Sequence, residues 1–167
     1  GASWSLTGPA GQVAVGLRAN FIASPVLNGL VLRCAPVAFF EDRAATPYRY
    51  PVRLGAAADA GSAGRTGMGA VRFEVSCPAN AFITGVRIGG GSQYVKWFGL
   101  ECSNLNLTGS PTTSFVFSAT AAGSFSAGPD GERTIWLPYT CPSSTLSRLP
   151  SVVRQFSGRL TSSGDIA

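Results

Sequence analysis

The sequence predicts an all-β domain built from a repeated unit, and three observations support this fold class. Only 13% of the 167 residues are charged while 45% are hydrophobic, a balance that favours packed sheets and turns over solvated helices. Short runs in which apolar and polar residues alternate, such as residues 71–75 (VRFEV), are typical of strands with one buried face. Two longer segments, residues 8–34 and 77–102, match each other in register.

A chain of this length holds one core, so we expect a single domain.

The first copy of the repeat occupies the N-terminal part of the chain. A strand is expected at residues 3–7 (SWSLT), where apolar and polar residues alternate. Residues 8–18 (GPAGQVAVGLR) begin with turn-forming Gly and Pro and continue as an apolar run, and residues 30–34 (LVLRC) predict a further strand that ends on a cysteine. Residues 41–66 are polar and rich in small side chains, so we expect loops that serve binding or assembly.

The second copy repeats this order. Residues 77–87 (CPANAFITGVR) place Pro, Gly and Arg in register with residues 8–18. Residues 98–102 (FGLEC) correspond to residues 30–34, so each copy closes on a cysteine. The strand predicted at residues 71–75 precedes this copy just as the N-terminal strand precedes the first. The match indicates one structural unit used at least twice.

The rest of the chain follows the same pattern of short strands and turns. Strands are predicted at residues 94–98 (YVKWF) and 114–118 (SFVFS), and turns at residues 89–92 (GGGS) and 128–131 (GPDG). Residues 103–124 are again polar and rich in small residues, and we expect a second binding or assembly loop there.

A third and more diverged copy occupies the C-terminal part. Residues 134–140 (TIWLPYT) resemble the strand before the second copy, Cys141 and Pro142 open the third, and residues 157–167 close it. The period is about 65 residues. The chain therefore divides into units at about residues 1–56, 57–122 and 123–167.

The four cysteines predict structural disulfides. Cys34, Cys77, Cys102 and Cys141 lie too far apart in sequence for the closely spaced pairs that ligate zinc or iron–sulfur clusters. Four cysteines allow three connectivities. We expect Cys77–Cys102, because these two bracket one copy of the repeat, together with Cys34–Cys141; free buried thiols are the alternative. Disulfides require an oxidising compartment, which predicts a secreted, extracellular protein.

The composition argues against an enzyme. The sequence contains no histidine, which excludes Ser-His-Asp and Cys-His nucleophiles and histidine-ligated metals. Carboxylate pairs for glycoside hydrolysis remain, namely Glu74 with Glu101 and Asp130 with Glu132. Glu74 alternates outward from an apolar strand face and the second pair flanks a turn glycine, so both are better explained as solvated carboxylates. We expect no catalysis, no metal and no cofactor.

Charge and hydropathy limit the partners. The net charge of +5 comes almost entirely from arginines, but these are scattered without a basic run that would follow a phosphate backbone, so we expect no nucleic acid partner. No apolar run is long enough to cross a membrane. The chain begins at Gly1 without a signal-like segment, and we expect any signal peptide to have been removed. One N-glycosylation sequon begins at Asn106.

The repeat resembles that of the vitelline membrane outer layer protein family. The shared features are the Cys-Pro opening, the Thr-Gly-Val-Arg strand, the Gly-rich turn and the closing Leu-Glu-Cys, and they cover most of residues 8–34 and 71–102 and part of residues 132–167. The resemblance implies the β-prism architecture that is also seen in jacalin-type lectins, in which three four-stranded Greek-key sheets surround a pseudo-threefold axis.

The sequence departs from the family pattern at two cysteines. Gly8 stands at the opening cysteine of the first copy, and Ala167 stands at the closing cysteine of the third. The resemblance therefore implies that Cys77–Cys102 staples one repeat, while the two remaining cysteines must pair with each other or stay free.

Two functions fit these observations, and we expect the first. It is a secreted structural protein that self-assembles or packs into an extracellular layer or filament, because both chain ends fall within a repeat and an unpaired sheet edge is a template for strand addition. Completion of one half-unit by the other within the chain is the alternative to an open edge.

The second function is that of a lectin-like module that binds an extracellular glycan. The resemblance to prism lectins implies it, and aromatic side chains beside polar turns would stack on sugar rings. Jacalin-type lectins use a Gly-x-x-x-Asp loop near the C-terminus, and Gly164-Asp165 is the nearest match with different spacing. The candidate contact residues for a glycan or partner are Tyr48, Tyr50, Tyr94, Trp97 and Asp165.

Overall fold

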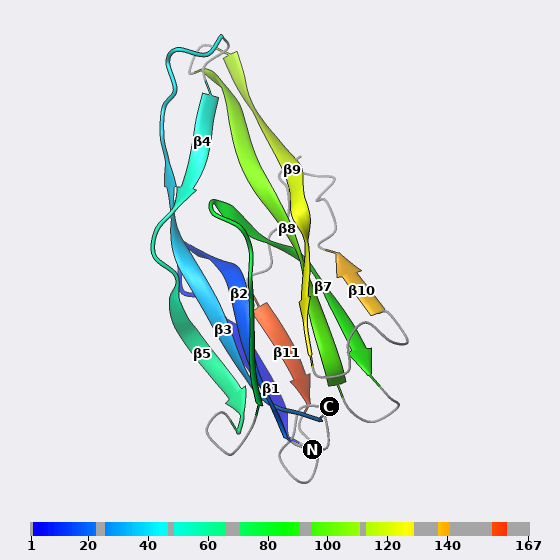
Figure 1. Cartoon of the computed structure of the whole chain (residues 1–167). Coiled ribbons are helices and arrows are strands. Elements are labelled where there is room, and N and C mark those ends of the chain that lie inside the picture. Colours follow the sequence, from blue (N-terminus) through cyan, green and yellow to red (C-terminus); the bar gives the residue numbers. More distant parts are fainter. Residues whose placement is uncertain are drawn as a thin grey trace.

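The computed structural model is all-β, as the sequence predicts (Figure 1). It describes residues 2–22, 26–46, 49–65, 71–90, 95–110, 113–128, 137–140 and 155–159. In these ranges the chain forms strands and no helix. The strands are β1 (Ser3–Thr7), β2 (Gln12–Ile22), β3 (Val26–Phe39), β4 (Arg49–Leu54), β5 (Ala58–Gly64), β6 (Val71–Ser76), β7 (Ala81–Gly90), β8 (Val95–Ser110), β9 (Thr113–Ala127), β10 (Leu137–Thr140) and β11 (Gln155–Arg159).

Two four-stranded antiparallel groups make up most of the molecule. The first, which we call the first sheet, has the order β6-β2-β3-β5, and the second sheet has the order β10-β7-β8-β9. Strand β4 pairs with the end of β3 and with β8, so it joins the two groups into one nine-stranded sheet. Strands β1 and β11 form a separate two-stranded sheet.

The two four-stranded sheets are copies of each other in detail. Each begins with the same turn, in which Gln12 N–H donates to Pro9 O at 3.2 Å and Ala81 N–H donates to Pro78 O at 3.0 Å. The third turn position has a positive φ in both copies, 74° at Gly11 and 61° at Asn80, as a type II turn requires and as Gly and Asn tolerate. The sequence match between residues 8–18 and 77–87 is therefore a match in backbone conformation.

The pairing registers also agree between the two sheets. β2 and β7 each carry a bulge just before the glycine of the repeat, Gly16 and Gly85. In each sheet this glycine pairs with a residue of the strand that leads into the next copy. Gly16 pairs with Ser76 of β6, and Gly85 pairs with Thr140 of β10. Each sheet thus takes one edge strand from the residues that lead into the following copy.

A second sequence match aligns the strands at the opposite edges of the two sheets, β5 and β9. The tripeptide Ser-Ala-Gly occurs at residues 62–64 in β5 and at residues 126–128 at the end of β9. A Cβ on Gly64 would lie 2.2 Å from Asn28 O, and one on Gly128 would lie 2.7 Å from Lys96 O. Both glycines allow the strand end to pass closely over the neighbouring backbone.

The hydrophobic core lies between the first sheet, the second sheet and the β1–β11 pair. Inward-facing residues of β2 and β3 contact those of β7 and β8, and Leu6 of β1 joins them at 4% exposure. Phe156 of β11 packs against the same cluster. The largest fully buried side chains are Phe21, Phe82, Leu17, Leu32, Ile83, Leu100, Cys34 and Cys102.

Two segments predicted as binding or assembly loops consist largely of strands, and only residues 114–118 within them were predicted as a strand. Residues 41–66 contain β4 and β5, and residues 103–124 contain half of β8 and most of β9. The hairpins at residues 37–54 and 104–119 pair through β4 and β8, and together they form an extension, which we call the arm, at the top of Figure 1. Small and polar residues did not predict strands here because backbone pairing, rather than side-chain alternation, fixes their conformation.

The predicted unit boundaries meet the strands differently. Residue 56 lies between β4 and β5, whereas residue 122 lies inside β9. The strand predicted at residues 94–98 starts β8, and that at residues 114–118 lies in β9. Most of the third copy lies outside the described residues.

Candidate functional site

The disulfide between Cys77 and Cys102 is present, as predicted. It ties the residue that opens the second copy to the middle of β8, where Cys102 is 2% exposed and belongs to the core. The bond therefore links the turn that precedes β7 to the strand with which β7 pairs.

Cys34 departs from the prediction. It is a free thiol that is completely buried in the core, so the predicted Cys34–Cys141 bond is not present; Cys141 itself lies outside the described residues. Cys34 occupies the position in the first sheet that Cys102 has in the second, but Gly8 stands where Cys77 stands. Burial raises the pKa of the Cys34 thiol above its usual value.

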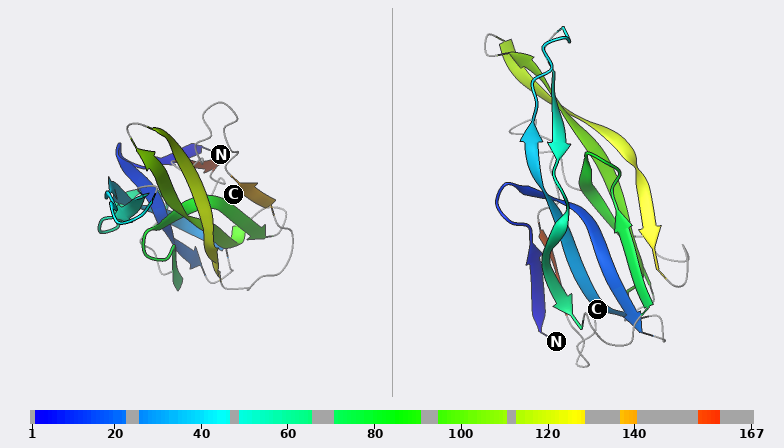
Figure 2. Two further views of the ribbon diagram at one scale, coloured as in Figure 1. Left: turned by 90° about the horizontal axis from the view of Figure 1, so that it is seen from above. Right: turned by 60° about the vertical axis from the view of Figure 1, so that its left-hand side comes forward.

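Strand β9 is the most distinctive surface element. It extends from Thr113 to Ala127, and in the described part of the chain it pairs only with β8. The sequence between Glu101 and Asp130 contains no charged residue, and residues 118–121 are exposed on both faces of the strand. At about 3.3 Å per residue this edge is about 50 Å long, and it forms the outer margin of the second sheet (Figure 2, right).

The arm also carries exposed aromatic side chains. Phe39 and Phe40 are 52% and 43% exposed at the end of β3. The guanidinium of Arg53 on β4 lies over the Phe40 ring, 4.3 Å from its centroid. Phe40 N–H donates to Pro51 O at 3.2 Å, which fixes this part of the hairpin. Both phenyl rings therefore stand on a paired backbone.

The outer face of the first sheet carries a network of arginines and carboxylates. Arg18 on β2 is paired with Asp59 on β5, and Arg33 on β3 is paired with Glu74 on β6. Arg33 Nε is also 3.8 Å from Asp59 Oδ1, and Arg72 Nη2 is 3.9 Å from Glu74 Oε2. The network crosses all four strands of the sheet. Its three arginines and two carboxylates leave one net positive charge.

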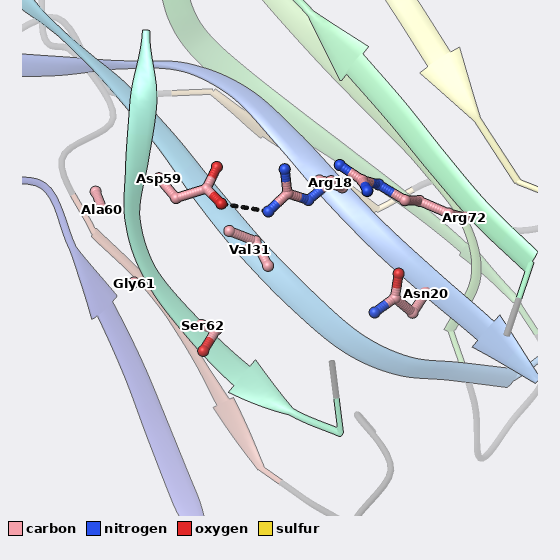
Figure 3. Close-up of a pocket in the computed structure, with 8 residues that line it drawn as sticks. All are labelled: Arg18, Asn20, Val31, Asp59, Ala60, Gly61, Ser62 and Arg72. Atoms are coloured by element: carbon pink, nitrogen blue, oxygen red, sulfur yellow. Dashed lines mark hydrogen bonds and ion pairs between the residues drawn. The ribbon is translucent and has the colours of Figure 1, made fainter. Parts of the chain in front are cut away.

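A cavity of about 510 Å³ opens on this face of the first sheet (Figure 3). Arg18, Asn20, Asp59, Ser62 and Arg72 supply its polar lining. Val31, Ala60 and Gly61 supply the remainder. The sequence analysis did not identify this site. The signal available was the Ser-Ala-Gly match, which identifies β5 as the strand equivalent to β9 and so as a partner of β3.

Of the predicted glycan-contact residues, the structure describes Tyr50 and Trp97, which lie on different strands. Trp97 on β8 is only 5% exposed, with its indole over Gly99, so the ring is not open to a sugar. Tyr50 lies on the arm, half-buried, and its hydroxyl donates to Glu41 Oε1 at 3.3 Å. Tyr48, Tyr94 and Asp165 lie outside the described residues.

The sequon residue Asn106 lies within β8. Its backbone is paired with Pro51 of β4 on one side and with Ser118 of β9 on the other. The side chain is half-buried. The predicted glycosylation site is therefore in a central strand of the arm and not in a loop.

The carboxylates considered for hydrolysis are separated. Glu74 belongs to the network of the first sheet, whereas Glu101 on the second sheet forms an ion pair with Arg87 at 2.6 Å. Asp130 and Glu132 lie outside the described residues. Among the described residues no group of His, Cys, Asp and Glu is arranged to hold a metal ion. Within the same ranges there is also no helix of the length and hydropathy needed to span a membrane.

Comparison of the chain with protein-family models, with curated proteins and with solved structures gave no match. The candidate functions below are therefore argued from the geometry of β9, of the arm and of the first sheet.

Proposed function

We propose that this is a secreted, non-catalytic structural protein that self-assembles into an extracellular layer or filament through the edge of β9. The observation that carries the proposal is the long, uncharged β9, which pairs only with β8 within the described ranges and exposes residues 118–121 on both faces. Monomeric β proteins usually protect such an edge with Lys, Pro or a short strand. β9 has no Lys and no Pro.

The physical basis of the assembly is strand addition. A free edge presents N–H and C=O groups that pair with a strand from another copy, and small side chains allow the two backbones to approach. Phe39 and Phe40 add exposed apolar surface on the same arm. A contact of this kind would bury the phenyl rings and satisfy the edge at once.

The structural unit of this assembly is proposed to be a three-sheet β-prism. Two relations support it. β6 and β10 each lead into the next copy and pair with the strand that starts the preceding one, and β1 leads into the first copy and pairs with β11 near the other end of the chain. In addition, β5 lies beside β1 in the same way as β9 lies beside β6. Both relations are those expected if three equivalent units follow one another around a closed ring of sheets.

The pairing of β1 with β11 changes where assembly is expected. The sequence analysis placed an open edge at the two chain ends, but Ser3 to Thr7 are paired with residues 155–159 of the same chain. These strands complete each other within the chain, which was the alternative considered. The edge proposed for assembly is consequently β9. Extracellular location is supported by the Cys77–Cys102 disulfide.

The test is the effect of a charged residue on this edge. Purified protein at neutral pH would be examined by size-exclusion chromatography and electron microscopy, together with Thr120→Lys in β9 and Ala10→Lys in an exposed turn as a control of equal charge. We expect fibres or sheets from the unmodified protein and from Ala10→Lys, and at least a tenfold higher critical concentration for Thr120→Lys, which corresponds to about 1.4 kcal/mol. Clean monomers of the unmodified protein, or unchanged assembly of Thr120→Lys, would contradict the proposal.

A lectin-like role is the second candidate, and the cavity on the first sheet is the observation that favours it.

A further inference from the structure

We propose that the cavity on the outer face of the first sheet binds a carboxylate-bearing saccharide, with the carboxylate between Arg18 and Arg72 and the hydroxyls at Asp59, Asn20 and Ser62. The site is separate from β9 and does not depend on assembly. Its volume of about 510 Å³ lies within the range of about 300–1,000 Å³ that is usual for small-ligand sites.

The charges of the lining select an anion. Arg18 is held by its ion pair with Asp59, yet a guanidinium has five N–H donors, so it retains donors for a ligand. The Arg72 side chain is 58% exposed, and its Nη2 lies 3.9 Å from Glu74 Oε2. Figure 3 shows the two guanidinium groups close together on neighbouring strands. Planar guanidinium groups match the geometry of a carboxylate.

The other lining groups favour a sugar over a simple anion. Asp59 offers a carboxylate oxygen, Asn20 an amide and Ser62 a hydroxyl, and these are the partners that sugar hydroxyls use as donors and acceptors. A carboxylate in the lining disfavours a highly charged ligand such as a polyphosphate by like-charge repulsion. Among the described residues none that lines the cavity is aromatic, so the recognition proposed here rests on hydrogen bonds and charge.

The second sheet shows why the cavity occurs in only one of the two copies. The corresponding region there has a volume of about 30 Å³ and is lined by Arg87, Trp97 and Ser124. The Trp97 indole fills this region. Its ring carbon Cη2 would lie only 3.0 Å from a Cβ atom if residue 99 had a side chain in place of glycine. The residue of the first sheet equivalent to Trp97 is Gly29. Loss of the indole opens the site, and Asp59 replaces the equivalent Ser124.

The test is calorimetric titration of the full chain, below its assembly concentration, with three probes. These are trigalacturonate, the neutral galactotriose, and a sulfated galactose oligosaccharide of the same length. We expect trigalacturonate to bind, galactotriose to bind at least tenfold more weakly, and the affinity for trigalacturonate to fall as salt increases. Equal binding of galactotriose or of the sulfated probe would overturn the carboxylate assignment.

Matched arginine variants locate the site. Arg72→Gln removes one charge at the cavity, and Arg43→Gln removes one charge from the arm, where the side chain is 76% exposed. We expect Arg72→Gln to weaken trigalacturonate binding at least tenfold and Arg43→Gln to leave it unchanged. Equal losses in both variants would indicate non-specific attraction to the basic protein, and an absence of binding by the unmodified protein would refute the site.

Discussion

At the scale of single residues, the residue at position 8 determines whether Cys34 forms a disulfide or remains a thiol. Cys34 and Cys102 occupy equivalent places in the core, but only Cys102 has a cysteine at the start of its repeat. With Gly8 at the corresponding position, Cys34 remains a thiol. Its complete burial makes it a small apolar core residue rather than a reactive group.

The buried thiol predicts a loss of stability at alkaline pH. Its pKa is raised in the folded state by burial, so the folded protein keeps the proton that the unfolded chain releases above about pH 8.5. The unfolded state then binds fewer protons, and the contribution of Cys34 to the free energy of unfolding falls as pH rises. Denaturant titrations should therefore show a stability difference between the unmodified protein and Cys34→Ala that is constant below pH 8 and shrinks above it.

Alkylation provides an independent check of the same residue. At pH 8 iodoacetamide should leave Cys34 unmodified in the folded protein and modify it after unfolding, as detected by peptide mass mapping. Rapid modification in the folded state would show that the thiol is accessible and would contradict its burial.

At the scale of the elements, the equivalence of the two sheets predicts that a disulfide can be transferred between them. Gly8→Cys should allow a bond to Cys34, because Gly8 is buried and precedes the same turn as Cys77. The closed loop has about the same length as the loop of Cys77–Cys102, and we expect a gain of about 3 kcal/mol in the free energy of unfolding.

Mass spectrometry and thermal unfolding test this transfer. The oxidised variant should carry one alkylatable thiol fewer than the oxidised unmodified protein, because Cys34 is now bonded, and it should unfold at a higher temperature. Ala10→Cys, at an exposed position two residues further along the chain, serves as the control that should not form the bond. A free thiol at position 8 in the folded, oxidised variant would show that the two copies differ in geometry.

Strands with side-chain alternation, such as β6, and the paired anchors around Gly16 and Gly85 were predictable, because their signal lies in the residues themselves. β5 was not, and of β9 only residues 114–118 were, since alanine, serine and glycine carry little strand preference and the pairing partner determines their conformation. The cavity of the first sheet depends on Arg18 and Asp59 meeting across strands that are far apart in sequence, so it was not visible in the chain order.

At the scale of the whole molecule, strands from opposite ends of the chain close the core. β1 pairs with β11, and Trp4 Nε1 donates to Arg159 O at 3.3 Å across 155 positions. Leu6 contributes from β1 to the same core as the central strands of both sheets. The pair therefore belongs to the structural unit and is not a peripheral addition.

Removal of the Leu6 side chain tests this role. Leu6→Ala should lower the free energy of unfolding by about 2–4 kcal/mol, because it leaves a cavity in a continuous core. Ser3→Ala, at an exposed position of the same strand, should change it by less than about 0.5 kcal/mol. Chemical denaturation followed by intrinsic fluorescence measures both. Equal stability of the two variants would show that β1 does not contribute to the core.

The long sequence separation of β1 and β11 also determines the order of folding. Hairpins of neighbouring strands, such as β2–β3, β7–β8 and β8–β9, require only short loops to close, whereas the β1–β11 pair must bring together the two ends of the chain. We infer that this pair forms last. Until it does, the site that Leu6 fills is open, and a β1 strand from a second chain can enter it. Because the β1–β11 pair forms last, the exchange of β1 strands between chains that are still folding competes with the folding of each chain on its own. A higher protein concentration favours the exchange.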